Sequence, residues 1–155
     1  SNVQENLISY LLIIFGVGVT LGNIVGGKLA DWNLNKSLQM IFTIFILYFV
    51  LLYFIQMNGF LMVAGIFFFG LIGFSMSPSL QFKSTLISKD APTLASTLNQ
   101  SAFNLGNALG AFIGGLVVTH LPVASLSLIA PILTAIGLIF LFISVAVEKK
   151  EGMTT

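Results

Sequence analysis

Residues 41–55 read IFTIFILYFVLLYFI, a run that contains one threonine and otherwise only apolar or tyrosine side chains. A helix of a soluble protein keeps a polar stripe for water, and this run has none. Strands of a membrane barrel alternate in hydropathy over about 10 residues, and this run does not alternate. The stretch therefore predicts a helix that crosses a lipid bilayer, where a helix satisfies its own backbone hydrogen bonds.

The rest of the chain repeats this pattern. A crossing needs about 20 mostly apolar residues at a rise of about 1.5 Å each, and four further segments meet that length. The chain is 57% hydrophobic and only 7% charged, whereas soluble domains carry about 25% charged residues. We therefore predict an all-α integral membrane protein, a partial bundle over residues 1–155 with five transmembrane helices. The expected spans are about 7–27, 37–57, 59–80, 95–118 and 125–147.

The basic residues are distributed on one side of the membrane that these spans define. Apart from His120 they are six lysines, and the other side receives Glu5, the turn Gln56-Met57-Asn58 and His120. Because cytoplasmic loops collect Lys and Arg, we expect the amino terminus outside and the carboxyl terminus in the cytoplasm, in the plasma (cytoplasmic) membrane. The tail from Glu148 to Glu151 is expected to lie in solvent, with its lysines anchoring the helix end. The six lysines are Lys28, Lys36, Lys83, Lys89, Lys149 and Lys150.

Glycine divides the five segments into two kinds. The first, third and fourth are rich in glycine, the second has none, and the fifth has only Gly137. Close packing of helices in lipid depends on small residues, so we expect the glycine-rich segments inside a bundle and the other two against lipid. The alternative is that glycine is merely common in membrane helices. The expected packing residues, spaced four apart, are Gly18, Gly22 and Gly26 in the first segment and Gly106, Gly110 and Gly114 in the fourth.

Uncharged polar side chains accompany the glycine-rich segments. Three amides of the fourth segment fall within about 60° of arc on a helical wheel, while Asn99 lies off that arc. Buried amides and hydroxyls either bond a neighbouring helix or line a wet cavity, and grouping on one arc favours the cavity. The candidate cavity residues are Asn23, Ser77, Gln100, Asn104 and Asn107.

Several functional classes lack their residues. No ionisable side chain lies in the middle of a span, and the chain has no cysteine and one histidine. General acid–base catalysis and metal binding therefore lack their groups, and no phosphate-binding or nucleophile motif is present. A net charge of +1 gives no sign of nucleic-acid binding. We expect a protein that is not an enzyme, with no catalytic residue, metal or cofactor.

Two stretches resemble the major facilitator superfamily: GVGVTLGNIVGGKLAD at residues 16–31 and ASTLNQSAFNLGNALGAFIGG at residues 95–115. The resemblance is to the twelve-helix drug:proton antiporter branch, which includes bacterial sugar and purine efflux permeases. It implies that the five segments correspond to helices eight to twelve of that fold, of which the ninth and twelfth are peripheral.

Residues 27–36 are similar to the family's cytoplasmic gating loop. The matching positions are Gly27, Asp31 and Lys36, and the departures are Trp32, Leu34 and Asn35. The resemblance implies that Asp31 faces the amino terminus of a helix in the first half of the carrier and acts as a latch, because an acid stabilises that end of a helix. The alternative is that Asp31 ends its own helix in solvent.

The resemblance implies the C-terminal part of a secondary active transporter, an efflux permease for a drug, sugar or nucleoside that works by alternating access. We expect a fragment that forms one cavity wall, lacks the N-terminal half and does not transport alone. Its partners would be the lipid bilayer, a small-molecule substrate and that missing half. The alternative is a small structural or subunit membrane protein that packs on a partner through its glycine-rich faces.

Overall fold

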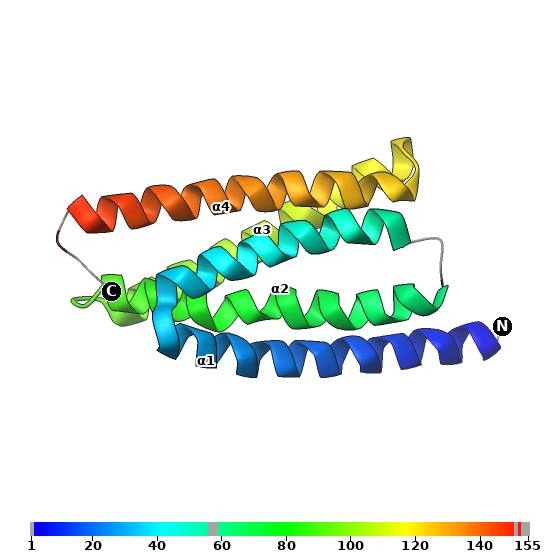
Figure 1. Cartoon of the computed structure of the whole chain (residues 1–155), viewed down its shortest axis with the longest axis horizontal. Helices are drawn as coiled ribbons and strands as arrows, with labels where there is room; N and C mark the ends of the chain where they lie inside the picture. Colours follow the sequence, from blue (N-terminus) through cyan, green and yellow to red (C-terminus); the bar gives the residue numbers. More distant parts are fainter. Residues whose placement is uncertain (1, 56–58, 151, 153–155) are drawn as a thin grey trace.

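Helices make up almost all of the described chain. The computed structural model describes residues 2–55, 59–150 and 152, with side chains from residue 7 onward, so Glu5 and the turn at 56–58 lie outside the description of side chains. Within these residues the structure contains no strand, which confirms the prediction of an all-α protein (Figure 1). The elements are α1 (Asn2–Ile55), α2 (Gly59–Ile87), α3 (Pro92–His120), the 3₁₀ turn η1 (Val123–Ser125) and α4 (Leu126–Lys150).

Helix α1 is too long to cross a bilayer once. Its apolar part, Leu7–Ile55, has 49 residues and would measure about 74 Å if straight, more than twice the roughly 30 Å of hydrocarbon. Asn33, with φ −163° and ψ 102°, interrupts the helix, and the chain reverses there (Figure 1). We call residues 2–32 the first arm and residues 34–55 the second arm of α1. The loop expected between 27 and 37 is thus a single non-helical residue.

Side chains at the kink replace the backbone hydrogen bonds that the interruption removes. The Oδ1 atom of Asn33 accepts the backbone N–H of Lys36 at 2.9 Å, so Asn33 caps the amino end of the second arm. The hydroxyl of Ser37, which is fully buried, donates to the carbonyl of Leu29 at 2.6 Å near the end of the first arm. Each arm thus has one of its terminal backbone groups bonded by a side chain at the kink.

Asn33→Ala is expected to lower the free energy of unfolding of the chain by about 1 kcal/mol, the usual value of an N-cap side chain. Unfolding of the purified chain by sodium dodecyl sulfate, followed by far-ultraviolet circular dichroism, measures this change. Asn23→Ala is the matched control, because the Asn23 amide bonds only within its own helix. Equal effects of the two substitutions would contradict the capping role.

The first arm packs on α2 through glycine. A Cβ atom added at Gly18, Gly22 or Gly26 would collide with the backbone of α2, so the two helices approach as closely as only small residues allow. The Ser79 hydroxyl of α2 also donates to the carbonyl of Gly26 at 3.1 Å. The carbonyl oxygens that would be struck are those of Phe67, Leu71 and Ser75, in that order.

The second arm and α4 pack together, although their sequences predicted outer positions against lipid. A Cβ at Gly137 of α4 would lie 2.9 Å from the ring of Phe42 on the second arm. Large side chains fill this contact, because glycine is not needed where backbones stay apart. Their outer faces remain exposed, for example at Leu47 and Phe140. The main buried apolar cluster lies beside this contact and joins three segments: Ala30 of the first arm, Leu34 and Leu38 of the second arm, and Leu141 and Val145 of α4.

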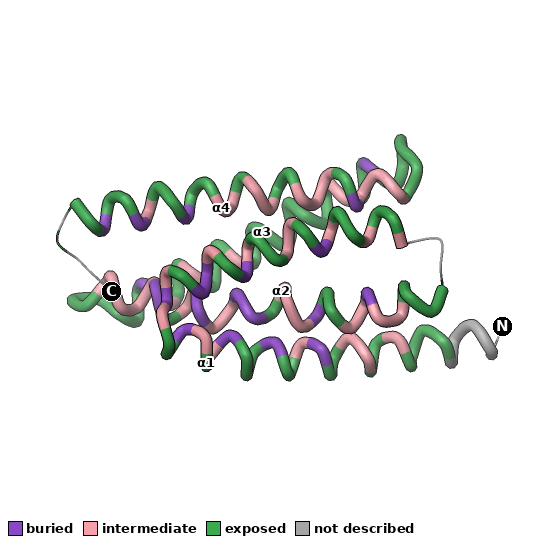
Figure 2. Tube along the Cα trace, viewed as in Figure 1, coloured by how far each residue is buried: buried purple, intermediate pink, exposed green. Residues whose placement is uncertain are grey.

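Helix α3 is the least covered helix, contrary to the expectation that the fourth segment lies inside the bundle. Only Ala95 and Val117 of α3 are buried, and Figure 2 shows the helix as mostly exposed. A Cβ at Gly106, Gly110 or Gly114 would meet open space. The expectation is wrong for this chain, because none of its described helices lies close against that glycine stripe.

The described chain has two distinct ends. One, which we call the kink end, holds Asn33, the carboxyl ends of α2 and α4 and the start of α3 (Figure 1). All six lysines belong to segments at or next to this end. His120 lies at the opposite end, where α3 finishes.

Candidate functional site

A cavity of about 320 Å³ lies between the second arm of α1, α2 and α3. Three of the candidate polar residues line it: Ser77 from α2, and Gln100 and Asn107 from α3. The two amides lie seven residues apart, about two helical turns, so they project from the same face of α3. The remaining lining residues are Phe45, Phe69, Gly73, Phe74 and Phe103.

Pro78 adds a further feature to the wall next to Ser77. It lies inside α2 and has no backbone N–H, so the carbonyl of Phe74, four residues earlier, lacks its helical donor. Phe74 itself lines the cavity. The helix beside the cavity thus lacks one of its backbone hydrogen bonds next to the residues that supply the hydroxyl and a phenylalanine ring.

The structure does not bring the other two candidates into this cavity. The Asn23 side chain donates to the Val19 carbonyl at 3.0 Å, one turn earlier in its own helix. Asn104 is exposed on α3 and does not belong to the cavity lining. The arc shared by the three amides is therefore wider than the part of α3 that faces α2.

Asn99, which the helical wheel placed off the arc, holds α3 to α2. Its Nδ2 atom donates to Oε1 of Gln81 at 2.6 Å. Both side chains are partly buried, and the bond lies towards the kink end from the cavity. Asn99 therefore has the structural role that its position on the wheel predicted.

The gating-loop residues lie around the kink. A Cβ at Gly27 would meet open space, and Asp31 and Lys36 are exposed. Within the described residues, neither the Asp31 nor the Lys36 side chain makes an interhelical bond. Asn35, one of the departures from the family pattern, does contact another helix: its Oδ1 accepts a hydrogen bond from Lys83 of α2 at 2.6 Å.

Lys83 and Glu148 form a buried ion pair at the kink end. The Nζ atom of Lys83 lies 2.6 Å from Oε1 of Glu148 and donates to its Oε2 at 2.8 Å. The hydroxyl of Ser144 also donates to Oε1, at 2.8 Å. Lys83 and Glu148 are only 5% and 4% exposed. Lys83, which the sequence placed in the break after the third span, therefore lies within α2, and the expectation that Glu148 lies in a solvated tail is wrong.

The sequence carries a signal for this pair that we did not use. Ser75, Ser79 and Lys83 are spaced four apart, so they follow one face of α2, and all three are buried. Glu148 likewise continues the buried face of α4 after Leu141 and Val145. A charged residue that lies on the buried face of a helix, just beyond its apolar run, is a candidate for an ion pair rather than for exposure to solvent.

The cavity has the groups for binding a neutral polar molecule and lacks the groups for chemistry. A hydroxyl and two carboxamides supply both donors and acceptors. No lining residue is ionisable, so the site has no general acid or base. A polar cavity between membrane-spanning helices is a feature of membrane carriers.

Comparison with known proteins places the chain within that class. The sequence profile of the Major Facilitator Superfamily matches residues 2–154, and the chain belongs to this family of non-enzymatic membrane transporters. It is 33% identical over 138 residues to the inner membrane transport protein YdhP of Escherichia coli (strain K12), covering 88% of this chain and 36% of that protein. No solved structure matches the chain.

Two other relatives have a similar extent. An uncharacterized MFS-type transporter of Bacillus subtilis (strain 168), YtbD, is 26% identical over 155 residues, which cover 96% of this chain and 38% of the relative. A probable sugar efflux transporter of Helicobacter pylori (strain ATCC 700392 / 26695) is 24% identical over 150 residues, which cover 96% and 38%. The chain thus spans little more than a third of the length of these relatives.

Proposed function

We propose that the chain forms one wall of the substrate cavity of a small-molecule efflux carrier. The observation that carries this proposal is the cavity that brings Ser77, Gln100 and Asn107 together among phenylalanines. Carboxamides and hydroxyls suit the hydroxyl groups of a sugar or nucleoside, and phenylalanine rings suit its apolar faces. A charged substrate is disfavoured, because no opposite charge lines this wall.

The remaining wall is proposed to come from a further part of the carrier. In each of these relatives, more than 60% of the sequence lies outside the part that matches this chain. Substrates of such carriers bind near the bilayer midplane between two repeats. The exposed apolar side chains of α3, such as Leu105 and Phe112, leave surface for a further helix. Alternating access would rock the two parts about the substrate, with Asp31 acting as a latch at the kink end.

Efflux from a chimera tests this proposal. The chain replaces the matching region of the Helicobacter pylori relative, and loss of a radiolabelled monosaccharide from preloaded cells is measured. Gln100→Leu and Asn107→Leu are each expected to slow efflux about threefold to tenfold, the effect of one hydrogen bond to a neutral group. Asn104→Leu is the matched control, because Asn104 is exposed outside the cavity. A control as slow as Asn107→Leu would reject the cavity wall.

The proposed orientation places the kink end in the cytoplasm, because all six lysines belong to segments at or next to it. Trp32, which is 69% exposed beside the kink, is a suitable site for a probe because the chain has no cysteine. Trp32→Cys is expected to resist an impermeant maleimide in intact cells and to react after permeabilisation. Labelling in intact cells would reverse the orientation.

A subunit role on a separate partner is the second candidate, because the same exposed surface of α3 would also serve a different polypeptide. Co-purification distinguishes the two. A subunit is expected to retain one defined partner at a constant ratio, whereas a carrier wall is expected to retain none unless the rest of its own carrier is supplied.

A further inference from the structure

Two rows of residues run along the sides of α2 and α3 that face each other. In each row the residues are spaced four apart, so they lie on one side of their helix. The two helices are joined by the short turn at 88–91, so the rows run in opposite directions from the kink end. The rows are Gly73, Ser77 and Gln81 on α2, and Asn107, Phe103 and Asn99 on α3.

The polar cavity lies where the α2 row offers only small residues. Gly73 has no side chain and Ser77 has a short one, and both line the cavity opposite α3. Gln81, one turn further along the row, is long enough to cross the gap, and its Oε1 accepts a hydrogen bond from Nδ2 of Asn99 at 2.6 Å. Neither of these two amides belongs to the cavity lining, so their bond lies at the limit of the cavity on the kink side.

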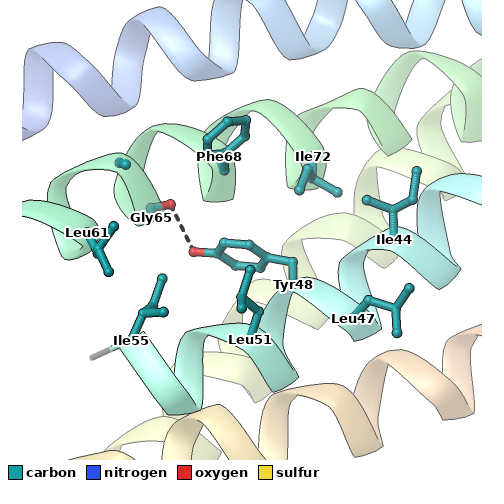
Figure 3. A pocket seen from close by; sticks show the side chains of 10 residues that line it. Ile44, Leu47, Tyr48, Leu51, Ile55, Leu61, Gly65, Phe68 and Ile72 are labelled. Carbon is teal, nitrogen blue, oxygen red and sulfur yellow. Dashed lines mark hydrogen bonds between the residues drawn. The ribbon is translucent and has the colours of Figure 1, made fainter. Parts of the chain in front are cut away.

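Helix α2 is held by α1 independently of this bond. The hydroxyl of Tyr48 on the second arm donates to the carbonyl of Gly65 on α2 at 2.9 Å, and its ring reaches from one helix to the other (Figure 3). On the first arm, the carbonyl of Gly26 accepts the Ser79 hydroxyl at 3.1 Å. Helix α3 has only two buried residues. It is therefore α3 that would move if the bond between Asn99 and Gln81 were lost.

We infer that the Asn99–Gln81 pair sets the largest substrate that the cavity admits, an inference that rests on the proposed carrier function. The combined length of the two side chains fixes the gap between α2 and α3 at the kink end of the cavity. A sugar or nucleoside that extends past Ser77 and Phe103 towards this end meets the pair. The two amides are positioning residues, because they act through the spacing of the helices rather than through contact with a small substrate.

Efflux of a monosaccharide and a disaccharide tests this inference in the chimera described above. The measured quantity is the ratio of the disaccharide rate to the monosaccharide rate from preloaded proteoliposomes. Gln81→Ala and Asn99→Ala are each expected to raise this ratio about threefold to tenfold, the effect of one neutral hydrogen bond. If the pair only held α3 in place, both rates would fall together. An unchanged ratio would therefore overturn the inference.

Two variants serve as controls for these substitutions. The exchange Gln81→Asn/Asn99→Gln keeps both amides and the total number of methylene groups, so it is expected to retain the original ratio. Asn104→Ala is expected to leave the ratio unchanged, because Asn104 is exposed on α3 outside the cavity. An exchanged pair as permissive as Gln81→Ala would contradict a role for the combined length. Should Gln81→Ala lose its helical circular dichroism, Gln81→Asn, shorter by one methylene group, takes its place.

A second measurement on the whole chain in nanodiscs does not depend on transport. Because the chain has no cysteine, Ser77→Cys/Phe103→Cys allows crosslinking between the rows by a short or a long bis-maleimide. Adding Gln81→Ala is expected to lower the yield of the short reagent relative to the long one about threefold, since the gap widens. An unchanged relative yield would overturn the inference. A lower relative yield in a chain whose chimera exports no sugar would reject the proposed substrate and support the control of the gap by the pair.

Discussion

Lys83→Met is expected to lower the free energy of unfolding by about 3–5 kcal/mol, because it leaves the Glu148 carboxylate buried without its cation. Both side chains are almost fully buried, and the lysine also donates to Asn35 beside the kink. One ammonium group therefore connects α2, α4 and the start of the second arm. Its removal breaks hydrogen bonds to two acceptors, Asn35 and Glu148, rather than to one. Unfolding of the purified chain by sodium dodecyl sulfate, followed by circular dichroism, gives the change.

Two variants separate this effect from a general loss of charge. Lys89→Met removes an exposed lysine at the same end and is expected to change the free energy of unfolding by less than about 0.5 kcal/mol. The double variant Lys83→Met/Glu148→Leu removes both charges and is expected to recover most of the lost stability, because an apolar pair of similar volume often equals a buried ion pair. A double variant as unstable as Lys83→Met alone would show that the pairing of charges is not what matters.

Gly22→Val is expected to destabilise the chain by at least about 3 kcal/mol, the upper end of the usual range for overpacking. Its first side-chain atom would collide with the backbone carbonyl of Leu71 and lie 3.1 Å from that of Gly70. Backbone atoms cannot rotate away as a side chain can, so the first arm and α2 must separate. The same unfolding titration measures the loss.

Gly106→Val is the matched control for this substitution. It makes the same chemical change on a helix where the added atoms meet open space, so it carries only the small helix-propensity difference between glycine and valine. If the two valine variants proved equally stable, close approach of the first arm to α2 would not contribute to folding.

The apolar segments could be predicted because hydropathy depends on composition alone. The spans near 59–80, 95–118 and 125–147 lie in α2, α3 and α4. Residues 7–27 of the first span and 37–55 of the second lie in the two arms of α1, although the single-residue break at Asn33 was not foreseen. A helix can reverse within one residue only when side chains such as Ser37 replace the missing backbone bonds, and hydropathy does not report such bonds.

Which helices pack together could be predicted only in part. Glycine spacing marks a face that is able to approach another backbone, and Gly18, Gly22 and Gly26 do so. The spacing does not indicate which helix will approach that face. The same spacing at Gly106 and Gly110 therefore predicted a close helix contact that is not present among the described residues. Conversely, Phe42 and Gly137 bring the second arm and α4 together without any small-residue pattern.

The polar residues show why a wheel is not sufficient to define a site. It correctly separated Asn99 from Gln100 and Asn107, because their angular offsets are intrinsic to the helix. It could not exclude Asn23, whose amide bonds the turn before it, since that choice depends on the local rotamer. Lys83 and Glu148 escaped notice because they are 65 residues apart and each sits at the end of an apolar run.

Because α3 is weakly attached, the free energy that holds it in place is separate from the free energy that keeps α1, α2 and α4 folded. Asn99 and Gln81 supply the side-chain hydrogen bond that joins α3 to α2, while the glycine contact and the ion pair hold α1, α2 and α4 without it. Native-state hydrogen exchange would therefore see α3 open as its own cooperative unit, below the energy of global unfolding. Two of the three polar side chains of the cavity, Gln100 and Asn107, belong to α3. In the proposed carrier the width of this cavity can thus adjust without any change in the contacts that hold α1, α2 and α4 together.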